Sequence, residues 1–183
     1  MVISSPAVAN GCVFVGSRDW RIYCLNASTG ETVWSYKTWH ELLSSPTVYN
    51  NSVYVGSNDG CVYCLDASTG TPLWESVVGG FVQSSPTVVD NKVYIGSGDH
   101  DFYCLNASDG SKIWQYTTLY RVDSAPAVAD GAVYFASDDY YVYALNASTG
   151  KEMWRTHTGS VVSSPCVYDG YITSALSMLT FVH

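Results

Sequence analysis

Positive charge is scarce in this sequence of 183 residues. Eight Lys and Arg stand against sixteen Asp and Glu, so the formal net charge is −8 at pH 7, and the basic residues form no cluster. A field of this sign repels nucleic acid and anionic membrane surfaces, and we exclude both as partners. Charged residues make up 13% of the chain and apolar residues 47%, a balance that excludes a disordered protein and favours a globular one.

Long apolar runs are absent as well. No stretch approaches the ~20 residues that a membrane-spanning helix requires, so we expect no membrane insertion. Met1 leads directly into a repeated pattern, with no basic region and no long apolar core after it, and we expect no signal peptide in this chain. The same start is compatible with a cut made inside a longer parent protein.

Helical periodicity is the third absence. Apolar residues nowhere recur with the period of about 3.6 residues that marks an amphipathic helix. Fifteen Tyr, six Trp and fifteen Gly instead favour strands and tight turns. We therefore predict an almost pure antiparallel β-protein.

What the chain does contain is a repeat of 40 residues, in which Trp, Gly and Pro recur in one register. The repeated positions are Trp34, Trp74, Trp114 and Trp154; Gly30, Gly70, Gly110 and Gly150; and Pro6, Pro46, Pro86 and Pro126, with Pro165 after a further 39 residues. We divide the single domain, 1–183, into repeats 1–40, 41–80, 81–120 and 121–159 and a partial repeat 160–183.

Each repeat divides into four short strands, which the second repeat illustrates. The first strand follows Ser44-Ser45-Pro46, the second covers Val53–Gly56, the third covers Val62–Leu65, and the fourth contains Trp74. The first two strands are joined by a pair of residues that tolerate positive φ, as the two-residue type I′ hairpin requires. These pairs are Asn10-Gly11, Asn50-Asn51, Asp90-Asn91, Asp130-Gly131 and Asp169-Gly170.

The second and third strands do not alternate between polar and apolar residues. Val53–Val55 and Val62–Leu65 are apolar throughout, so both faces of each antiparallel sheet must be buried. Small sheets covered on both sides and repeated along a chain describe the blades of a β-propeller, whereas a barrel or sandwich would show polar alternation on its outer face. We predict an all-β fold of four propeller blades and a partial fifth, forming an open arc or part of a ring of about seven or eight blades.

The turn that closes the third strand and the Trp that follows it resemble a motif of a known repeat family. Ala144–Gly150 followed by Trp154 resembles the tryptophan-docking motif Ala-x-Asp-x-x-Thr-Gly-x-x-x-Trp of pyrroloquinoline-quinone-type (PQQ-type) propeller repeats, with Asn146 in place of Asp. The second copy keeps the acid at Asp66 but has Cys64 in place of Ala. The other two copies match at Cys24, Asn26, Thr29, Gly30 and Trp34, and at Cys104, Asn106, Gly110 and Trp114, with Asp109 in place of Thr.

This repeat is known from quinoprotein dehydrogenases and from the outer-membrane assembly lipoprotein. The resemblance implies that each Trp packs between neighbouring blades, and it favours a location in the cell envelope or outside the cell. WD repeats are excluded because their Gly-His and Trp-Asp pairs are absent. The resemblance implies far less about activity, because one fold hosts many functions.

The cysteines indicate packing rather than a metal or redox site. Cys61 and Cys64 are three residues apart, so on a strand their side chains point to opposite faces and cannot share one metal ion or disulfide. We expect the cysteines at the small position of Ala144 to be buried, and Cys166 to occupy another small inner position, which Ala7 fills in the first repeat. The cysteines at the position of Ala144 are Cys24, Cys64 and Cys104.

Recurring Asn and Asp residues indicate turns. Asn26, Asn106 and Asn146 each begin an Asn-Ala-Ser sequon and Asn50 begins Asn-Asn-Ser, but Asp66 holds the same turn in the second repeat, which favours turn hydrogen bonds over glycosylation. A second series recurs at one turn position, and this regular recurrence favours hairpin capping over calcium binding. It consists of Asp19, Asp59, Asp99 and Asp139. The four His residues lack metal-ligand spacing, and no Ser-His-Asp arrangement can be built.

Loop variability distinguishes the two ends of the blades. The turns between first and second strands and between third and fourth strands barely differ among the repeats, whereas the other two loop sets differ greatly. In a four-stranded meander the two variable sets lie on one face, where aromatic and charged residues are typical of a binding surface and neutral drift is the alternative. The candidate binding residues are Trp20, Trp39, His40, His100, Tyr120, Arg121 and Tyr140.

These observations favour a non-enzymatic propeller that presents its variable face to a protein, peptide or glycan. The rival is a fragment of a quinoprotein oxidoreductase, for which the resemblance implies pyrroloquinoline quinone, a calcium ion, a catalytic Asp and, in many members, adjacent cysteines. No adjacent cysteine pair is present and we find no Asp apart from the repeating turn positions, so we assign no catalytic residue, metal ligand or cofactor. An inert repeat fragment of a larger surface protein is the third alternative.

The partial fifth repeat determines the expected shape. It contains Ser163-Ser164-Pro165, a turn at Asp169-Gly170 and Tyr171-Ile172, but the pattern fails at Thr173-Ser174 and no docking Trp follows Leu176. Because the chain starts at a first strand, no strands remain to complete the fifth blade, and we expect an open arc. Its apolar end faces would be covered by further repeats of a longer parent or by self-association.

Overall fold

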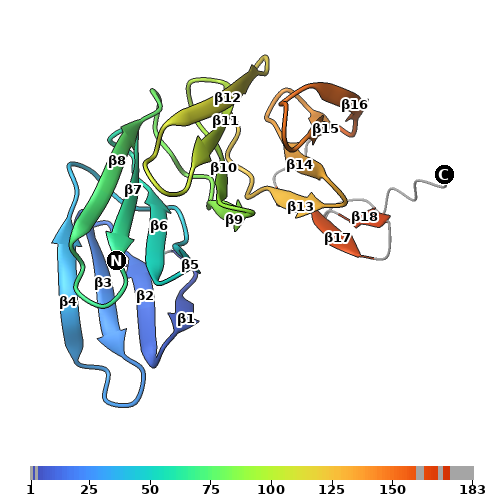
Figure 1. The fold of residues 1–183 in the computed structure, drawn as a ribbon. Coiled ribbons are helices and arrows are strands. Elements are labelled where there is room, and N and C mark those ends of the chain that lie inside the picture. The colour runs from blue at the N-terminus through green and yellow to red at the C-terminus, as the bar shows by residue number, and fades with distance from the viewer. Residues whose placement is uncertain (1, 3, 160–162, 169–170, 174–183) are drawn as a thin grey trace.

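The computed structural model describes residues 2, 4–159, 163–168 and 171–173. They form four four-stranded antiparallel sheets and one two-stranded sheet, which follow one another around an open arc (Figure 1). The predicted all-β propeller fold is confirmed, and none of these residues is helical. The described part of the chain accordingly has no helix long and apolar enough to cross a membrane.

Consecutive strands pair in chain order within each blade. The first two blades contain β1 (Ala7–Ala9), β2 (Cys12–Gly16), β3 (Arg21–Asn26) and β4 (Thr32–Lys37), then β5 (Thr47–Tyr49), β6 (Ser52–Gly56), β7 (Cys61–Asp66) and β8 (Pro72–Val77). The next two contain β9 (Thr87–Val89), β10 (Lys92–Gly96), β11 (Asp101–Asn106) and β12 (Lys112–Thr117), then β13 (Ala127–Ala129), β14 (Ala132–Ala136), β15 (Tyr141–Asn146) and β16 (Glu152–His157). The fifth sheet contains β17 (Cys166–Tyr168) and β18 (Tyr171–Thr173).

The first hairpin of each complete blade has the predicted turn. Both central residues have positive φ in all four, for example 51° at Asn10 and 73° at Gly11, which confirms the type I′ prediction. The fifth expected turn, Asp169-Gly170, and the break in the pattern after Thr173 lie outside the described residues.

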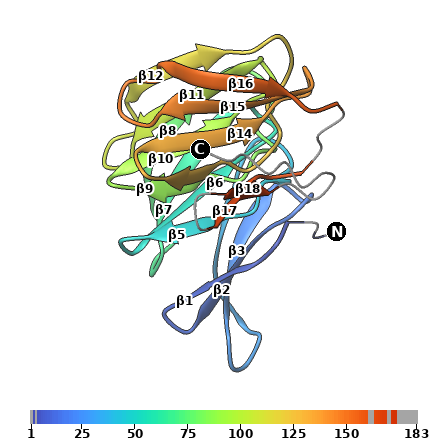
Figure 2. The ribbon, with the colours of Figure 1, turned by 90° about the vertical axis from the view of Figure 1, so that its right-hand side faces the viewer.

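The first strands line the inside of the arc. β1, β5, β9, β13 and β17 contact one another in that order along the concave side, and the fourth strands lie outermost (Figure 1). Figure 2, which looks toward the fourth blade, shows its strands running side by side. Each blade thus has two ends. The uniform end carries the turns between first and second strands and between third and fourth strands. The variable end carries the two variable loop sets, which together form the variable loop face.

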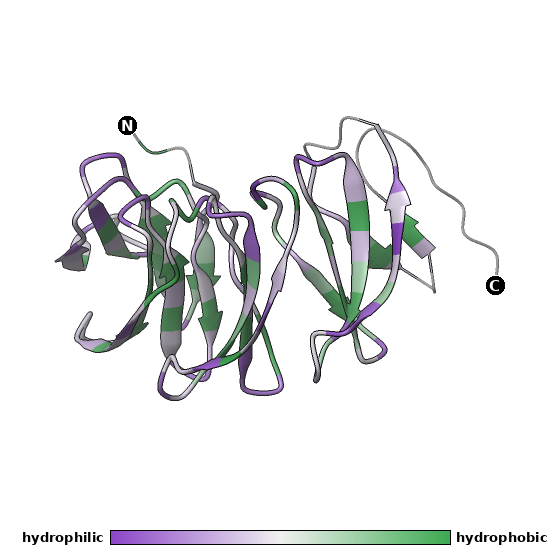
Figure 3. Ribbon diagram, turned by 90° about the horizontal axis from the view of Figure 1, so that it is seen from above, coloured by the Kyte–Doolittle hydropathy of each residue, from purple (hydrophilic) through white to green (hydrophobic). Residues whose placement is uncertain are grey.

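The core lies between the sheets in three layers. In the first layer Phe14 and Ile22 of the first blade pack against Val53, Tyr63 and Leu65 of the second. The other two layers join the second blade to the third and the third to the fourth. Hydrophobic residues accordingly lie along the strands and hydrophilic ones at many of the turns (Figure 3). Burial on both faces explains why the second and third strands lack polar alternation.

Each fourth-strand Trp of the first three blades connects its blade to the next. The indole of Trp34 lies on Gly70, where a Cβ atom would come within 2.6 Å of the ring, and its Nε1–H donates a hydrogen bond to the carbonyl of Ala67 at 3.0 Å. Trp74 and Trp114 repeat this arrangement on the following blades. Glycine is therefore required at position 70 for two reasons. Its φ is 73°, and the indole occupies the space that a side chain would fill.

A β-bulge accompanies each docking Trp. In the third blade the pairing of β11 with β12 shifts by one residue, so that the exposed Ile113 is skipped next to Trp114. The other three complete blades show the same shift. In the fourth blade Trp154 packs against Ala136 and Val142.

The cysteines are free thiols that mostly serve as small core residues. Cys24, Cys64 and Cys104 are buried as predicted, and burial raises the pKa of Cys64 to about 11, which makes it an unreactive thiol. Cys61 and Cys64 belong to core layers on opposite sides of the second blade. The inner position predicted for Cys166 is wrong: this residue is exposed, because β17 lies at the end of the described arc whereas β13 has neighbours on both sides.

Candidate binding surface

The loop after each second strand is built by one Ser and one Asp. In the second blade the backbone N–H of Asp59 donates to Ser57 Oγ at 3.3 Å, and the N–H of Cys61 donates to Asp59 Oδ1 at 3.0 Å. The other carboxylate oxygen accepts from the Tyr63 hydroxyl at 2.9 Å. Asp19, Asp99 and Asp139 make the same bonds, which confirms the hairpin-capping role of this series.

The residue after this Asp has a left-handed backbone. Gly60 has φ of 87°, which glycine adopts readily, but Trp20, His100 and Tyr140 have φ of 70°, 79° and 73°. A bulky residue in this region is an outlier that costs about 1–3 kcal/mol and persists only where its surroundings determine it. Three of the four complete blades therefore keep a ring where glycine would be less strained.

In two blades this ring lies against a second ring from the loop between blades. Trp20 stacks on His40 with ring centroids 6.0 Å apart and planes at 17°. His100 lies 6.1 Å from Tyr120. One ring of each pair follows a second strand and the other follows a fourth strand, so the two variable loop sets meet on one face of the arc.

In the fourth blade the partner ring comes from a strand. Tyr140 lies 6.4 Å from His157, the last residue of β16, which sequence reasoning did not select. Lys37 holds the same strand position in the first blade, and its Nζ lies 5.8 Å from the Trp20 ring. The hairpin register could have located both residues, because the last residue of the fourth strand pairs with the residue that follows the left-handed position.

The second blade replaces the ring pair with close backbone packing. A Cβ atom at Gly60 would lie 2.3 Å from the carbonyl oxygen of Gly79, and one at Gly80 would lie 2.4 Å from the backbone nitrogen of Asp99. The ring pair of the first blade is thus separated from the rings of the third and fourth by loops that pack backbone against backbone at Gly60 and Gly80.

Two exposed residues on this face have their backbone N–H groups held by hydrogen bonds to the next blade. Trp39 is 78% exposed, yet its N–H donates to Asp59 at 2.9 Å. Leu119 is also exposed, and its N–H donates to Asp139 at 3.1 Å. Little backbone freedom remains to be lost when a partner binds such residues. Leu119 was not among the predicted residues, although it precedes Tyr120 just as Trp39 precedes His40.

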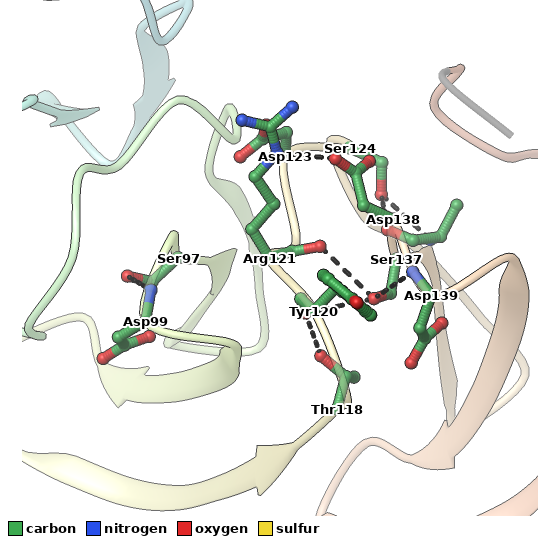
Figure 4. A network of polar contacts seen from close by, with 11 residues as sticks. Ser97, Asp99, Thr118, Tyr120, Arg121, Asp123, Ser124, Ser137, Asp138 and Asp139 are labelled. Atoms are coloured by element: carbon green, nitrogen blue, oxygen red, sulfur yellow. Dashed lines mark hydrogen bonds and ion pairs between the residues drawn. The ribbon is translucent and has the colours of Figure 1, made fainter. Parts of the chain in front are cut away.

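Hydroxyl groups hold the loop between the third and fourth blades (Figure 4). Ser137 Oγ donates to the carbonyls of Tyr120 at 3.1 Å and of Arg121 at 3.2 Å, and the Thr118 hydroxyl also donates to the Tyr120 carbonyl. The side chains of Tyr120 and Arg121 are therefore not needed to fix the main chain of this loop.

Arg121 lies between two carboxylates (Figure 4). Its Nε is 2.5 Å from Asp138 Oδ2 and 3.1 Å from Asp123 Oδ2. The hydrogen bond to Asp138 raises the pKa of Arg121, and burial raises the pKa of Asp123. Asp123 Oδ1 is buried and has no hydrogen-bond partner among the described residues. Asp123 thus stands apart from the repeating turns, which corrects the expectation that every Asp belongs to them.

The opposite ends of the blades are uniform. Asn26 Oδ1 accepts from the N–H groups of Ser28 and Thr29 at 2.9 and 3.0 Å. Asp66 and Asn146 make the same pair of bonds in their turns. The predicted turn role of this series is confirmed.

A calcium ion beside a quinone does not fit the side chains that are described. These residues include no group of three or more His, Cys, Asp or Glu placed to bind a metal ion. Asp123 and Asp138 both contact Arg121, and the recurring loop acids accept hairpin hydrogen bonds.

A sequence family described as outer membrane protein assembly factor BamB matches residues 2–80 and 58–177. The chain belongs to this family of PQQ-type propeller repeats. No curated protein matches the chain in sequence.

Solved structures share the fold. BamB from Moraxella catarrhalis has a TM-score of 0.81 at 20% identity, over 94% of this chain and 57% of that one. The quinohemoprotein alcohol dehydrogenase ADHIIG from Pseudomonas putida HK5 has 0.78 at 18% identity, over 95% and 38%. The quinohemoprotein alcohol dehydrogenase from Comamonas testosteroni has 0.76 at 17% identity, over 87% and 35%. The chain spans little more than half of the first structure and less than two fifths of the others, and at these identities the likeness shows the fold alone.

Proposed function

We propose that this chain is a non-enzymatic binding propeller whose variable loop face holds a protein or peptide partner. The observation that carries the proposal is the left-handed backbone of Trp20, His100 and Tyr140, whose side chains are exposed. Among the described residues, these rings lie outside the core layers and contact only other rings or side chains of the same face, and a binding role explains why glycine does not replace them.

The chemistry of the face supports a polypeptide partner. Trp, Tyr and Arg dominate binding energy in protein interfaces, and this face presents Trp39, Tyr120, Tyr140 and Arg121. The family is described by an assembly factor for outer membrane proteins, which supports both a protein partner and a location in the cell envelope. Exposed rings also stack on sugars, so a glycan is the alternative ligand, and the likeness to quinohemoprotein dehydrogenases keeps an oxidoreductase fragment as the rival.

Selection of phage-displayed random peptides on the full chain tests this proposal. The selected peptides should bind Trp39→Ala and Tyr140→Ala at least about tenfold more weakly, which is roughly 1.4 kcal/mol. The melting midpoint of each variant should stay near that of the wild type, because both rings are exposed. Ser68→Ala, in the uniform turn, is the matched control and should leave peptide binding unchanged.

Three results would count against the proposal. Peptides weakened by Ser68→Ala but not by the ring variants would place binding at the uniform end. Glycans captured on an array by the wild type and lost with Trp39→Ala would favour the alternative ligand. Calorimetric binding of pyrroloquinoline quinone with calcium at about micromolar Kd would favour the oxidoreductase.

A further inference from the structure

Positive charge is unevenly distributed over the fold. Of the eight Lys and Arg in the chain, the first blade contains Arg18, Arg21 and Lys37, and the second blade contains none. All three lie at the variable end, because Arg18 is in the loop after β2, Arg21 begins β3 and Lys37 ends β4. The pairing of β3 with β4 thus brings together, at one end of one blade, basic residues that form no cluster in the sequence.

Two of these residues form a like-charge pair across the sheet. Arg21 lies directly opposite Lys37, an arrangement in which like charges repel and destabilise the strand pair. Arg21 Nη1 donates to Ser35 Oγ at 3.1 Å, and neither Arg21 nor Lys37 forms an ion pair with an acid among the described residues. The other complete blades oppose no two positive charges at these positions. They have Cys61 with Val77, Asp101 with Thr117, and Tyr141 with His157.

Arg18 adds a third positive charge, which the neighbouring acids neutralise only in part. Its Nε lies 3.7 Å from Glu41 Oε2, and the Arg18 side chain is 46% exposed. An ion pair this exposed contributes little and leaves the guanidinium accessible to another carboxylate. Asp19, in the same loop, already accepts from the Tyr23 hydroxyl at 2.7 Å and from the N–H of Arg21 at 3.2 Å. The side chains of this loop therefore leave positive charge available to a partner.

Exposed rings lie beside these charges. Lys37 Nζ is 5.8 Å from the centroid of the Trp20 ring, which is 42% exposed and stacks on His40. Trp39, two residues after Lys37, is more exposed still. A partner at this end of the blade thus meets positive charge and large apolar rings together. We name the surface formed by Arg18, Trp20, Arg21, Lys37 and Trp39 the basic subsite.

The same positions carry the opposite charge further along the arc. Asp101 of the third blade corresponds to Arg21, and Asp138 of the fourth blade corresponds to Arg18. The variable loop face is therefore polarised along its length. A partner that lies across it is oriented by charge, with its own acidic part directed to the first blade.

We propose that the basic subsite binds an acidic peptide segment, with a carboxylate at Arg21 and Lys37 and a neighbouring apolar or aromatic side chain on Trp20 or Trp39. This inference rests on the function proposed above and specifies the chemistry of the peptide partner. A carboxylate beside the opposed pair replaces a repulsion with two charge-assisted contacts. The net charge of −8 repels an extended polyanion such as nucleic acid, whereas a short acidic segment meets chiefly the local charge of the first blade.

Peptide selection with two matched double variants tests this proposal. Random peptides displayed on phage are selected on the full wild-type chain and then measured on the variants by fluorescence anisotropy. Arg21→Gln with Lys37→Gln removes the opposed pair. Lys92→Gln with Lys151→Gln removes the same two charges at the uniform end, because Lys92 begins β10 and Lys151 directly precedes β16. Thermal melts check that both double variants remain folded.

The selected peptides should contain Asp and Glu at no less than about twice their share in the library, next to an apolar or aromatic residue. The tightest peptide should bind the Arg21 and Lys37 double variant at least about tenfold more weakly, and the Lys92 and Lys151 control within about twofold of the wild type. Raising NaCl from about 50 to 500 mM should weaken binding to the wild type more than binding to the Arg21 and Lys37 double variant.

The possible failures separate this inference from the proposed function. Peptides that require Trp39 and Tyr140 but are not acidic, or that bind both double variants equally, would overturn the basic subsite and leave the peptide-binding function standing. A selection that yields no binding peptide would overturn both. Vesicles containing phosphatidylglycerol, or double-stranded DNA, that bind the wild type and not the Arg21 and Lys37 double variant would assign the charges to another macromolecule and overturn the acidic peptide.

Discussion

The two ends of each blade use the same backbone conformation with different residues. In the turn between the third and fourth strands, at the uniform end, the left-handed residue is glycine in every complete blade: Gly30, Gly70, Gly110 and Gly150. At the variable end it is Trp20, His100 and Tyr140, and glycine only at Gly60. Glycine is required where a neighbour occupies the space of its Cβ, as the indoles do at Gly70, Gly110 and Gly150 and the backbone of Gly79 does at Gly60. A neighbour in the Cβ space thus requires glycine at these four positions, whereas the rings at the variable end have room for their side chains.

The largest loss in the free energy of unfolding should come from a substitution at a docking Trp, whose indole packs on the next blade. Trp114→Ala removes a half-buried indole and its hydrogen bond to the next blade, and we expect the free energy of unfolding to fall by about 3 kcal/mol. Ile113→Ala, one residue away on the exposed side of β12, should change it by less than about 1 kcal/mol. Urea denaturation measures both. A loss at Trp114 no larger than that at Ile113 would show that the docking indole is peripheral.

The next largest loss should distinguish the effect of close packing on the free energy of unfolding from that of backbone strain. Gly60→Ala would place a Cβ atom 2.3 Å from the carbonyl oxygen of Gly79, and we expect a loss of about 2 kcal/mol. Gly11→Ala has the same kind of backbone with no neighbour within 4 Å and should lose only about 1 kcal/mol. Equal losses in urea denaturation would mean that the Gly79 backbone moves aside readily, and that strain alone explains the glycine.

The strands and turns could be predicted because each depends on residues close together in the chain. The pair Asn10-Gly11 is sufficient for its hairpin. The cluster of Arg121, Asp123 and Asp138 could not, because it joins a loop between blades to a loop within one. Nor could the exposure of Cys166, which depends on what lies beside its sheet.

The left-handed backbone at the variable end is also indicated by the sequence. A single glycine, Gly60, in a position otherwise held by rings indicates a left-handed backbone there, and the three bulky residues share it. Which rings pair with them depends on side-chain directions across two loops. That information is absent from the repeat pattern, apart from the register that locates His157.

A smaller effect, of opposite sign, should appear at the variable end. Tyr140→Gly relieves a strained backbone, and we expect a gain of about 1 kcal/mol in the free energy of unfolding. Tyr140→Ala is the control, because it removes the ring and its contact with His157 but keeps a Cβ at positive φ, and it should give no gain. Thermal and urea melts measure the difference. A loss with Tyr140→Gly would show that the ring stabilises the fold and is not retained for binding.

The smallest effect concerns charge at the variable end and depends on pH. Burial raises the pKa of Asp123, so the fold favours its protonated form. Its contribution to stability is therefore complete below the ordinary Asp pKa, about 3.9, and is lost as pH rises through the raised value. Asp123→Asn should match the wild type near pH 3 and exceed it at pH 7 by less than about 1 kcal/mol. Asp138→Asn, which breaks the exposed ion pair with Arg121, should instead lose up to about 0.5 kcal/mol at pH 7. Urea denaturation at both pH values measures these differences. A destabilised Asp123→Asn at pH 7 would mean that attraction to Arg121 outweighs burial.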